Sequence, residues 1–175
     1  MKEGIDMIDS FNDVLKARRS TREYTEEGVS KEDMQQIVEA GRLAPSGMGR
    51  NELMFVGLTN EYAKEYLSIA KNKFGMDRYY SAKHIILVFR NKEIESLYLL
   101  DVGAAMENML LKATNLGLQS CWIHAAKDLA ENKDFSKFQE KLGLDGKYEI
   151  LESIAIGHGK KTIDKEVDNS RAKVF

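Results

Sequence analysis

The chain has 175 residues, 43% of them hydrophobic and 31% charged, which predicts one soluble globular domain with its own core. Its formal net charge of −2 excludes the large excess of positive charge that is typical of nucleic-acid-binding proteins. The single cysteine excludes an internal disulfide and a multi-cysteine zinc site, and the three histidines form no recognisable metal motif. The first residues lack the apolar segment of a signal peptide, and no apolar run reaches membrane-spanning length. We therefore expect a cytoplasmic protein that needs no metal, no membrane and no nucleic-acid partner.

Helical patterns dominate the N-terminal part of the chain. Apolar residues from Met7 to Leu15 recur at helical spacing and predict a first helix that runs toward the sequence ARRST. Ser30 is a suitable N-cap for a second helix. Pro45, the only proline of the chain, ends that helix because proline cannot continue a helical hydrogen-bond pattern.

Strands and helices alternate in the middle of the chain. The apolar run 53–59 predicts a strand, 60–74 returns to helical spacing, and 84–89 is typical of a fully buried strand. The longest periodic segment, 95–117, is apolar on more than one side and predicts a central helix that ends at Gly117.

The C-terminal third continues this alternation. A short strand is predicted at 119–123, a polar helix at 127–142 and a last strand at 148–157, followed by the polar tail 158–175. Because strands alternate with helices and no linker divides the chain, we expect a single α+β layered domain over residues 1–175.

Two segments carry residues suited to a ligand. Arg18, Arg19 and Arg22 surround the hydroxyl of Ser20, and such a group of cations and donors suits a phosphate, although cations also favour an ordinary helix end. In the segment 42–51, a rigid helix stop precedes glycines that allow close approach of a ligand, or that form a plain turn.

The remaining motifs restrict the class of site. Cys121 lies between apolar neighbours and is more typical of a small core residue than of a nucleophile, and Trp122 is likewise more typical of the core. The Gly-x-Gly-x-x-Gly and P-loop motifs are absent from the sequence, which argues against a Rossmann or Walker-type nucleotide site.

The order of these segments is more specific than any one of them. RRSTREY, then APSG after a helix, then NMLLKATNLGLQSCWI and a final AIGHGKK strand resemble the nitroreductase family of FMN-dependent oxidoreductases over about residues 11–171. The resemblance implies a mixed, mainly antiparallel sheet flanked by helices, and a homodimer formed through long central helices. It also implies two FMN sites at the dimer interface, with the tail 158–175 wrapping the partner subunit.

The resemblance assigns one group of residues to the phosphate end of FMN. Arg18, Arg19 and Ser20 would hold the phosphate and ribityl chain, and Arg171 in the tail would complete the phosphate site. Arg22 falls where the family has a cation near the pyrimidine edge of the flavin, where reduced flavin carries negative charge.

A second group would surround the flavin ring. Pro45, Ser46 and Gly47 of the partner subunit would pack beside the isoalloxazine, so that a rigid helix stop fixes where the loop meets a flat ring. His124 and Ala125 would approach the side of the ring that carries N5.

Several positions depart from the family pattern. The family loop commonly has asparagine and then glutamine–proline–tryptophan where this chain has Gly49, Asn51, Glu52 and Leu53, so substrate selection is open. Many relatives carry glycine or glutamate where this chain has His124, whose imidazole could donate a proton or shape the pocket.

The reaction that the resemblance implies is a ping-pong exchange. NADH or NADPH reduces FMN and leaves, and an electron-poor acceptor such as a quinone or nitroaromatic is then reduced in the same place. The flavin carries this chemistry, so we expect no indispensable side-chain acid or nucleophile. Two alternatives remain at this point: a specialised flavin enzyme for a dedicated metabolite, and a non-enzymatic flavin-binding or storage protein.

Overall fold

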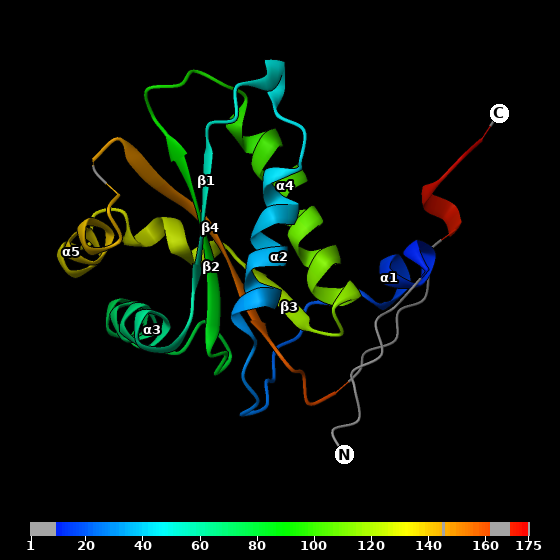
Figure 1. Ribbon diagram of the computed structural model, residues 1–175, viewed down its shortest axis with the longest axis horizontal. Coiled ribbons are helices and arrows are strands. Elements are labelled where there is room, and N and C mark those ends of the chain that lie inside the picture. Colours follow the sequence, from blue (N-terminus) through cyan, green and yellow to red (C-terminus); the bar gives the residue numbers. More distant parts are fainter. Residues whose placement is uncertain (1–9, 145, 162–168, 175) are drawn as a thin grey trace.

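The computed structural model describes residues 10–144, 146–161 and 169–174, and Figure 1 shows how their elements are arranged. The strands are β1 (Leu53–Leu58), β2 (His84–Asn91), β3 (Gln119–Ile123) and β4 (Tyr148–Gly157). The α-helices are α1 (Phe11–Ala17), α2 (Lys31–Arg42), α3 (Asn60–Phe74), α4 (Tyr98–Asn115) and α5 (Lys133–Lys141). Short 3₁₀ turns are η1 (Gly47–Gly49), η2 (His124–Leu129) and η3 (Asn169–Arg171).

The four strands form one sheet in the order β1-β2-β4-β3, and each of its three ladders is antiparallel. A single parallel bridge joins Ser20 to Ser120 beside this sheet. Helices α2 and α4 cover one face of the sheet, whereas α3 and α5 lie on the other (Figure 1). The expectation of an α+β sheet flanked by helices is therefore confirmed.

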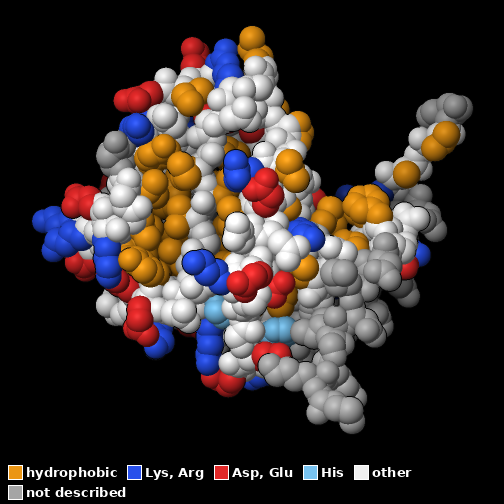
Figure 2. Space-filling model, in the orientation of Figure 1, with side chains coloured by type: hydrophobic (Ala, Val, Ile, Leu, Met, Phe, Trp, Pro, Cys, Tyr) orange, Lys and Arg blue, Asp and Glu red, His pale blue; other side chains and the backbone are white. Residues whose placement is uncertain are grey.

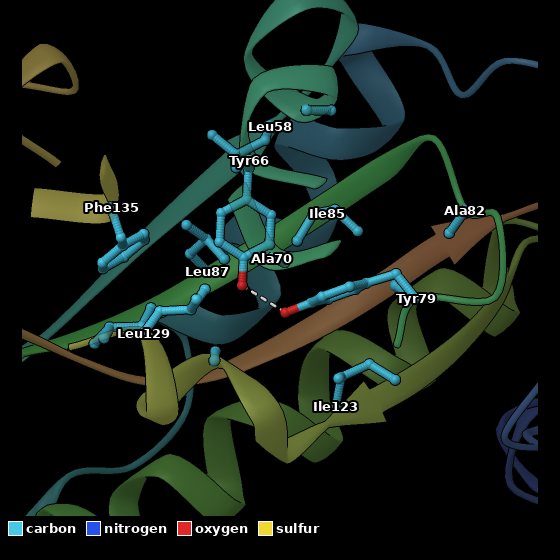
Figure 3. Close-up of a cluster of buried hydrophobic side chains, with 14 of the residues drawn as sticks. Leu58, Tyr66, Ala70, Tyr79, Ala82, Ile85, Leu87, Ile123, Leu129 and Phe135 are labelled. Atoms are coloured by element: carbon cyan, nitrogen blue, oxygen red, sulfur yellow. Dashed lines mark hydrogen bonds between the residues drawn. The ribbon is translucent and has the colours of Figure 1, made fainter. Parts of the chain in front are cut away.

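The face covered by α3 and α5 is packed with aromatic side chains. Tyr66, Phe135 and Phe138 are buried there, with ring centroids 6.1 Å apart between Tyr66 and each phenylalanine. The Tyr66 and Tyr79 hydroxyls are hydrogen-bonded at 2.5 Å. Figure 3 shows the two side chains pointing toward each other. Tyr79 also hydrogen-bonds to Ser153, so the hydroxyls in this core have partners.

The face covered by α2 and α4 is packed with aliphatic and methionine side chains. Met34 and Ile37 from α2 meet Met106 and Met109 from α4. Gly41 allows the two helices to come close, because a Cβ at that position would lie 2.9 Å from the Met109 sulfur. The central helix is therefore packed tightly against its neighbour as well as against the sheet.

Some boundaries differ from the sequence-based expectation. Helix α1 begins at Phe11, and the predicted start at Met7 lies outside the described residues. The central helix α4 is shorter at both ends than the predicted 95–117, and Gly117 adopts the left-handed φ of 74° that suits a helix stop.

The polar helix predicted at 127–142 was wrong in its extent. The chain instead forms the 3₁₀ turn η2 and then the helix α5. Asn132 separates them, because its side chain accepts hydrogen bonds from the backbone N–H groups of Asp134 and Phe135 and so begins a new helix. None of the helices in the described ranges is long and apolar enough to cross a membrane.

Candidate functional site

An N-terminal strap, residues 18–25, lies along the edge strand β3 and the end of β4. The Thr21 N–H donates to the Ser120 carbonyl oxygen at 2.9 Å. Tyr24 is buried, and its hydroxyl donates to the Ala155 carbonyl oxygen at 3.2 Å. The Tyr24 ring lies directly over Gly157, where a Cβ would come within 2.9 Å of it. These contacts fix the strap on the sheet edge.

The predicted phosphate-binding residues converge at the beginning of β3. Arg18 pairs with Glu107 of α4 at 3.3 Å, and an Arg19 guanidinium nitrogen, Nη1, donates to the Arg18 carbonyl oxygen at 2.6 Å. The Arg19 Nε and the Ser120 hydroxyl are buried without a hydrogen-bond partner among the described residues. Buried donors of this kind normally have partners, so their arrangement fits an anionic group bound at this point.

Arg22 and Cys121 lie close to the same segment. The Arg22 guanidinium sits 5.9 Å from the centroid of the Tyr80 ring and also donates to the Ser20 carbonyl oxygen at 3.3 Å. Burial raises the pKa of the Cys121 thiol, although the Arg22 charge and a hydrogen bond with Ser20 act in the opposite direction. The thiol is therefore a buried core group beside the strap, and its raised pKa disfavours a nucleophilic thiolate.

The Pro45–Gly47 loop lies at the other end of the α2–α4 pair. The Gly47 N–H donates to a carboxylate oxygen of buried Asp101, in the first turn of α4, at 2.9 Å. The Ser46 hydroxyl accepts a hydrogen bond from the Asn51 N–H at 3.1 Å, which closes the loop on itself. Pro45 is exposed, and it borders a hollow of about 440 Å³ between α2, β1 and α4.

His124 follows β3 directly and is bonded to a neighbouring strand. Its Nδ1 lies 2.9 Å from one carboxylate oxygen of Glu152 on β4. The indole N–H of Trp122 donates to the other oxygen of the same carboxylate at 2.8 Å. The His124 side chain is 73% exposed, whereas Glu152 is only 14% exposed. The carboxylate is thus fixed by two donors, and within the described residues no hydrogen bond is recorded for the second ring nitrogen of His124.

The sheet edge at β3 presents Ser120, Trp122 and His124 on one face. Side chains alternate along a strand, so Ser120 and Trp122 point to the same face, and His124 continues this series. Trp122 packs against the core beneath α2 and α4, which places all three on that side. Ser120 and His124 are about 13 Å apart at the rise of a strand.

The remaining predicted residues occupy separate places in the chain. Ala125 is half-buried in η2, next to His124. Arg171 lies in the exposed turn η3, which projects away from the sheet on the side of α1 in Figure 1. The Arg18 and Gly47 groups both touch α4, at Glu107 and Asp101, which lie about 9 Å apart along the helix at the helical rise.

Sequence reasoning missed three side chains of this region. Ser120 could have been found from strand alternation, since it shares a face with Trp122. Asp101 and Glu152 gave no local signal, because each acts on a residue far away in the sequence. No group of three or more metal-ligating side chains occurs in the part of the chain that the structure describes.

The structure is thus an α+β protein in which helices flank an antiparallel sheet and an arginine-containing strap, the candidate site, lies along one sheet edge. The chain belongs to the nitroreductase family, whose sequence model matches residues 15–74 and 60–158. These two matches together cover most of the chain and include the strap, the Pro45 loop and His124.

Individual relatives agree with this assignment. The chain is 25% identical over 156 residues to an Archaeoglobus fulgidus protein provisionally named an NADH dehydrogenase/NAD(P)H nitroreductase, with 86% of each protein covered. A Bacteroides fragilis nitroreductase crystallised with bound FMN has a TM-score of 0.82 at 24% identity, covering 95% of this chain and 99% of that one. An FMN-dependent nitroreductase from Clostridium difficile has a TM-score of 0.70 at 29% identity, covering 91% and 92%. The nitroreductase fold is therefore confirmed.

Proposed function

We propose that this protein is an FMN-dependent oxidoreductase that takes hydride from NADH or NADPH and passes it to an electron-poor acceptor. Family membership and the FMN-bound and FMN-dependent structural relatives support this function. Within the chain, the observation that carries it is that Arg19 Nε and Ser120 Oγ, in the strap and on the strand beside it, are among the buried polar atoms without a partner in the described residues. When bound, the flavin would supply the hydride exchange, and the protein would bind and orient the reactants.

The strap would hold the phosphate end of the cofactor. Arg18 and Arg19 offer guanidinium groups and Ser20 offers a hydroxyl, all next to the beginning of β3. A phosphate there would satisfy the buried Arg19 donor, and charge-assisted hydrogen bonds of this type are among the strongest in proteins. Arg171 of the tail would add a further cation to this phosphate.

The ring of the flavin would lie toward the other end of β3. His124 and Ala125 would border its N5 side, and Arg22 would place positive charge near its pyrimidine edge. The loop Pro45–Gly47 would contact the ring from the partner subunit. The Asp101–Gly47 hydrogen bond supports this role because it fixes the loop to the rigid helix α4.

This arrangement requires a homodimer, and the surface of the chain supports one. Leu99 and Leu100 on α4 are 72% and 71% exposed, and exposed Leu43 and Phe11 lie on the neighbouring helices. An added Cβ at Gly103 of α4 would meet no atom within 4 Å, so another helix could approach there. Figure 2 shows hydrophobic side chains gathered over α1. Burial of such apolar area drives association, with the tail of one subunit against the other.

The acceptor and the cycle complete the proposal. Quinones and nitroaromatics would bind where the nicotinamide has left, in a ping-pong order, and the enzyme would work in the cytoplasm. The protein would align donor and acceptor in turn over one face of the ring and exclude water from it. A side-chain nucleophile is not required, in agreement with the buried, unreactive thiol of Cys121.

Anaerobic spectroscopy tests the proposed function directly. The FMN-loaded protein is mixed with NADH, and in a second experiment with NADPH, while flavin absorption is followed. We expect rapid bleaching with at least one donor and return of the absorption when a quinone is added. A yellow protein that neither donor bleaches would instead indicate flavin storage, and a protein that ignores added FMN would contradict any flavin function.

A further inference from the structure

Three side chains beyond the cofactor-binding strap form one hydrogen-bonded unit. Glu152 on β4 accepts from the Trp122 indole at 2.8 Å and pairs with His124 Nδ1 at 2.9 Å. Because indole nitrogen is only a donor, the Trp122 bond occupies one carboxylate oxygen and leaves the other for the imidazole. The Trp122 and His124 hydrogen bonds thus converge on the Glu152 carboxylate, which accepts both of them.

The backbone around Glu152 contributes to this geometry. The ladder between β2 and β4 pairs Val88 with Glu152 but Phe89 with Ile150, so Leu151 is an extra residue in a β-bulge. Bulges change the direction in which the following side chain points, and they are common beside functional sites. The bulge immediately precedes Glu152. The Glu152 carboxylate then bonds to Trp122 on the neighbouring strand β3 and to His124, which follows that strand.

From these contacts we infer that Glu152 is a positioning residue which orients His124 as a proton donor to the oxygen of a quinone-type acceptor. This inference rests on the proposed flavin function and names the acceptor class for it. The Glu152 carboxylate accepts from Nδ1, so the Nε2–H of the protonated imidazole points away from β4. In the transfer, the Nε2–H bond breaks and an acceptor O–H bond forms, while the reduced cofactor supplies the electrons.

The surroundings of the imidazole favour this role. Its 73% exposure lets solvent return the proton after each transfer. The Trp122 ring lies 5.4 Å from the His124 ring, and an indole face stabilises a nearby cation. Glu152 is the charged group bonded to the imidazole, and Lys127 and Asp128 carry the other charges of the turn η2. The carboxylate and the indole ring thus both lie beside the imidazole.

Nuclear magnetic resonance tests the positioning step without any turnover. The imidazole nitrogen signals of the three histidines are recorded in the full chain, and His124→Gln identifies the signals of His124. Glu152→Gln replaces the carboxylate that accepts from Nδ1, so the nitrogen signals of His124 should shift. The matched control is Glu149→Gln, which removes a neighbouring β4 carboxylate that pairs with Arg90 instead and should leave the His124 signals in place. Unchanged His124 signals in Glu152→Gln would overturn the positioning role.

Two acceptors then test the acceptor class. A quinone needs a proton when it is reduced, whereas ferricyanide takes an electron alone. We expect His124→Gln and Glu152→Gln to slow quinone reduction at least tenfold more than they slow ferricyanide reduction. An equal ratio of the two rates in native protein and His124→Gln would overturn the proton-donor role. If the protein binds no flavin at all, the proposed function fails, yet the nitrogen spectra still show whether Glu152 holds His124.

Discussion

The two faces of the sheet differ in how many of their buried polar groups have hydrogen-bond partners within the chain. Beneath α3 and α5, aromatic rings pack edge to face and the hydroxyls of Tyr66, Tyr79 and Ser153 bond to one another. At the β3 edge, the Arg19 Nε and the Ser120 hydroxyl are buried without partners among the described residues. The hydroxyls of the aromatic core are therefore satisfied within the chain, whereas these two donors are available to a ligand.

This difference indicates where function resides in the fold. The exposed leucines of α4, the strap and His124 all belong to the α2–α4 side or its edge. A face that binds a cofactor and a second subunit must keep apolar area and polar donors available in the isolated chain. The opposite face supplies the rigid support, and the Ser153 hydroxyl links the two by donating to the Ile123 carbonyl oxygen just before His124.

The largest expected effect comes from the aromatic core beneath α3 and α5. Phe135→Ala should lower the free energy of unfolding by roughly 3–5 kcal/mol, because it opens a cavity among packed rings. Chemical denaturation measures this, with Ser136→Ala on the exposed side of the same helix as control. If the account is right, the variant that remains folded binds FMN as well as the native protein does.

The second prediction concerns the subunit interface. Leu100→Glu places a charge on the exposed apolar face of α4, so it should weaken the dimer by about 100-fold or more. Sedimentation at several concentrations measures the effect, and Met76→Glu, at another exposed apolar position, is the control. A native protein that sediments as a single chain at all concentrations would contradict the proposed shared site.

The third prediction addresses the unsatisfied donors of the strap. Arg19→Ala removes a charge-assisted partner of the phosphate worth roughly 1.5–3 kcal/mol, so FMN affinity should fall roughly 10- to 150-fold. Arg78→Ala, which removes an exposed arginine near Phe74, should leave the affinity unchanged. Equal losses in both variants would mean that general charge, rather than the strap, attracts the cofactor.

A smaller effect is expected from the hydroxyl chain. Tyr66→Phe removes one hydroxyl while Tyr79 keeps its bond to Ser153, so stability should fall by only about 0.5–1.5 kcal/mol. Thermal unfolding measures the change. A loss as large as that of Phe135→Ala would show that the network, and not ring packing, dominates this core.

The smallest effect should appear as a pH dependence. His84 is buried, and its Nε2 accepts from the Val29 N–H just before α2. Burial, together with the Lys83 charge, lowers the pKa of His84 below its usual 6.5. The unfolded chain therefore binds the proton first, and stability should decline as the pH falls below about 6.5. The decline should be shallower in His84→Gln, and identical pH profiles would contradict this role.

Local signals in the sequence located most elements of the fold. Pro45 and Gly117 marked helix ends that depend only on the conformations of neighbouring residues. The predicted polar helix failed at Asn132, whose side chain competes for backbone donors and so begins a helix within a region of helical composition.

The candidate site was only partly visible in the sequence. The arginines of the strap are adjacent in the chain, so their charge is evident without a structure. The buried state of Ser120, the Asp101–Gly47 bond and the Glu152–His124 pair depend on strand order and helix packing. Such long-range contacts leave no periodicity or motif in the sequence, which explains why they were missed.

The most direct test of the account compares two flavins that differ only in the phosphate. The protein is freed of bound flavin and titrated with FMN and with riboflavin while flavin fluorescence is followed. If the strap holds the phosphate, FMN should bind at least roughly tenfold more tightly than riboflavin, and Arg19→Ala should reduce this preference. Equal affinities for the two flavins in the native protein would contradict the central claim.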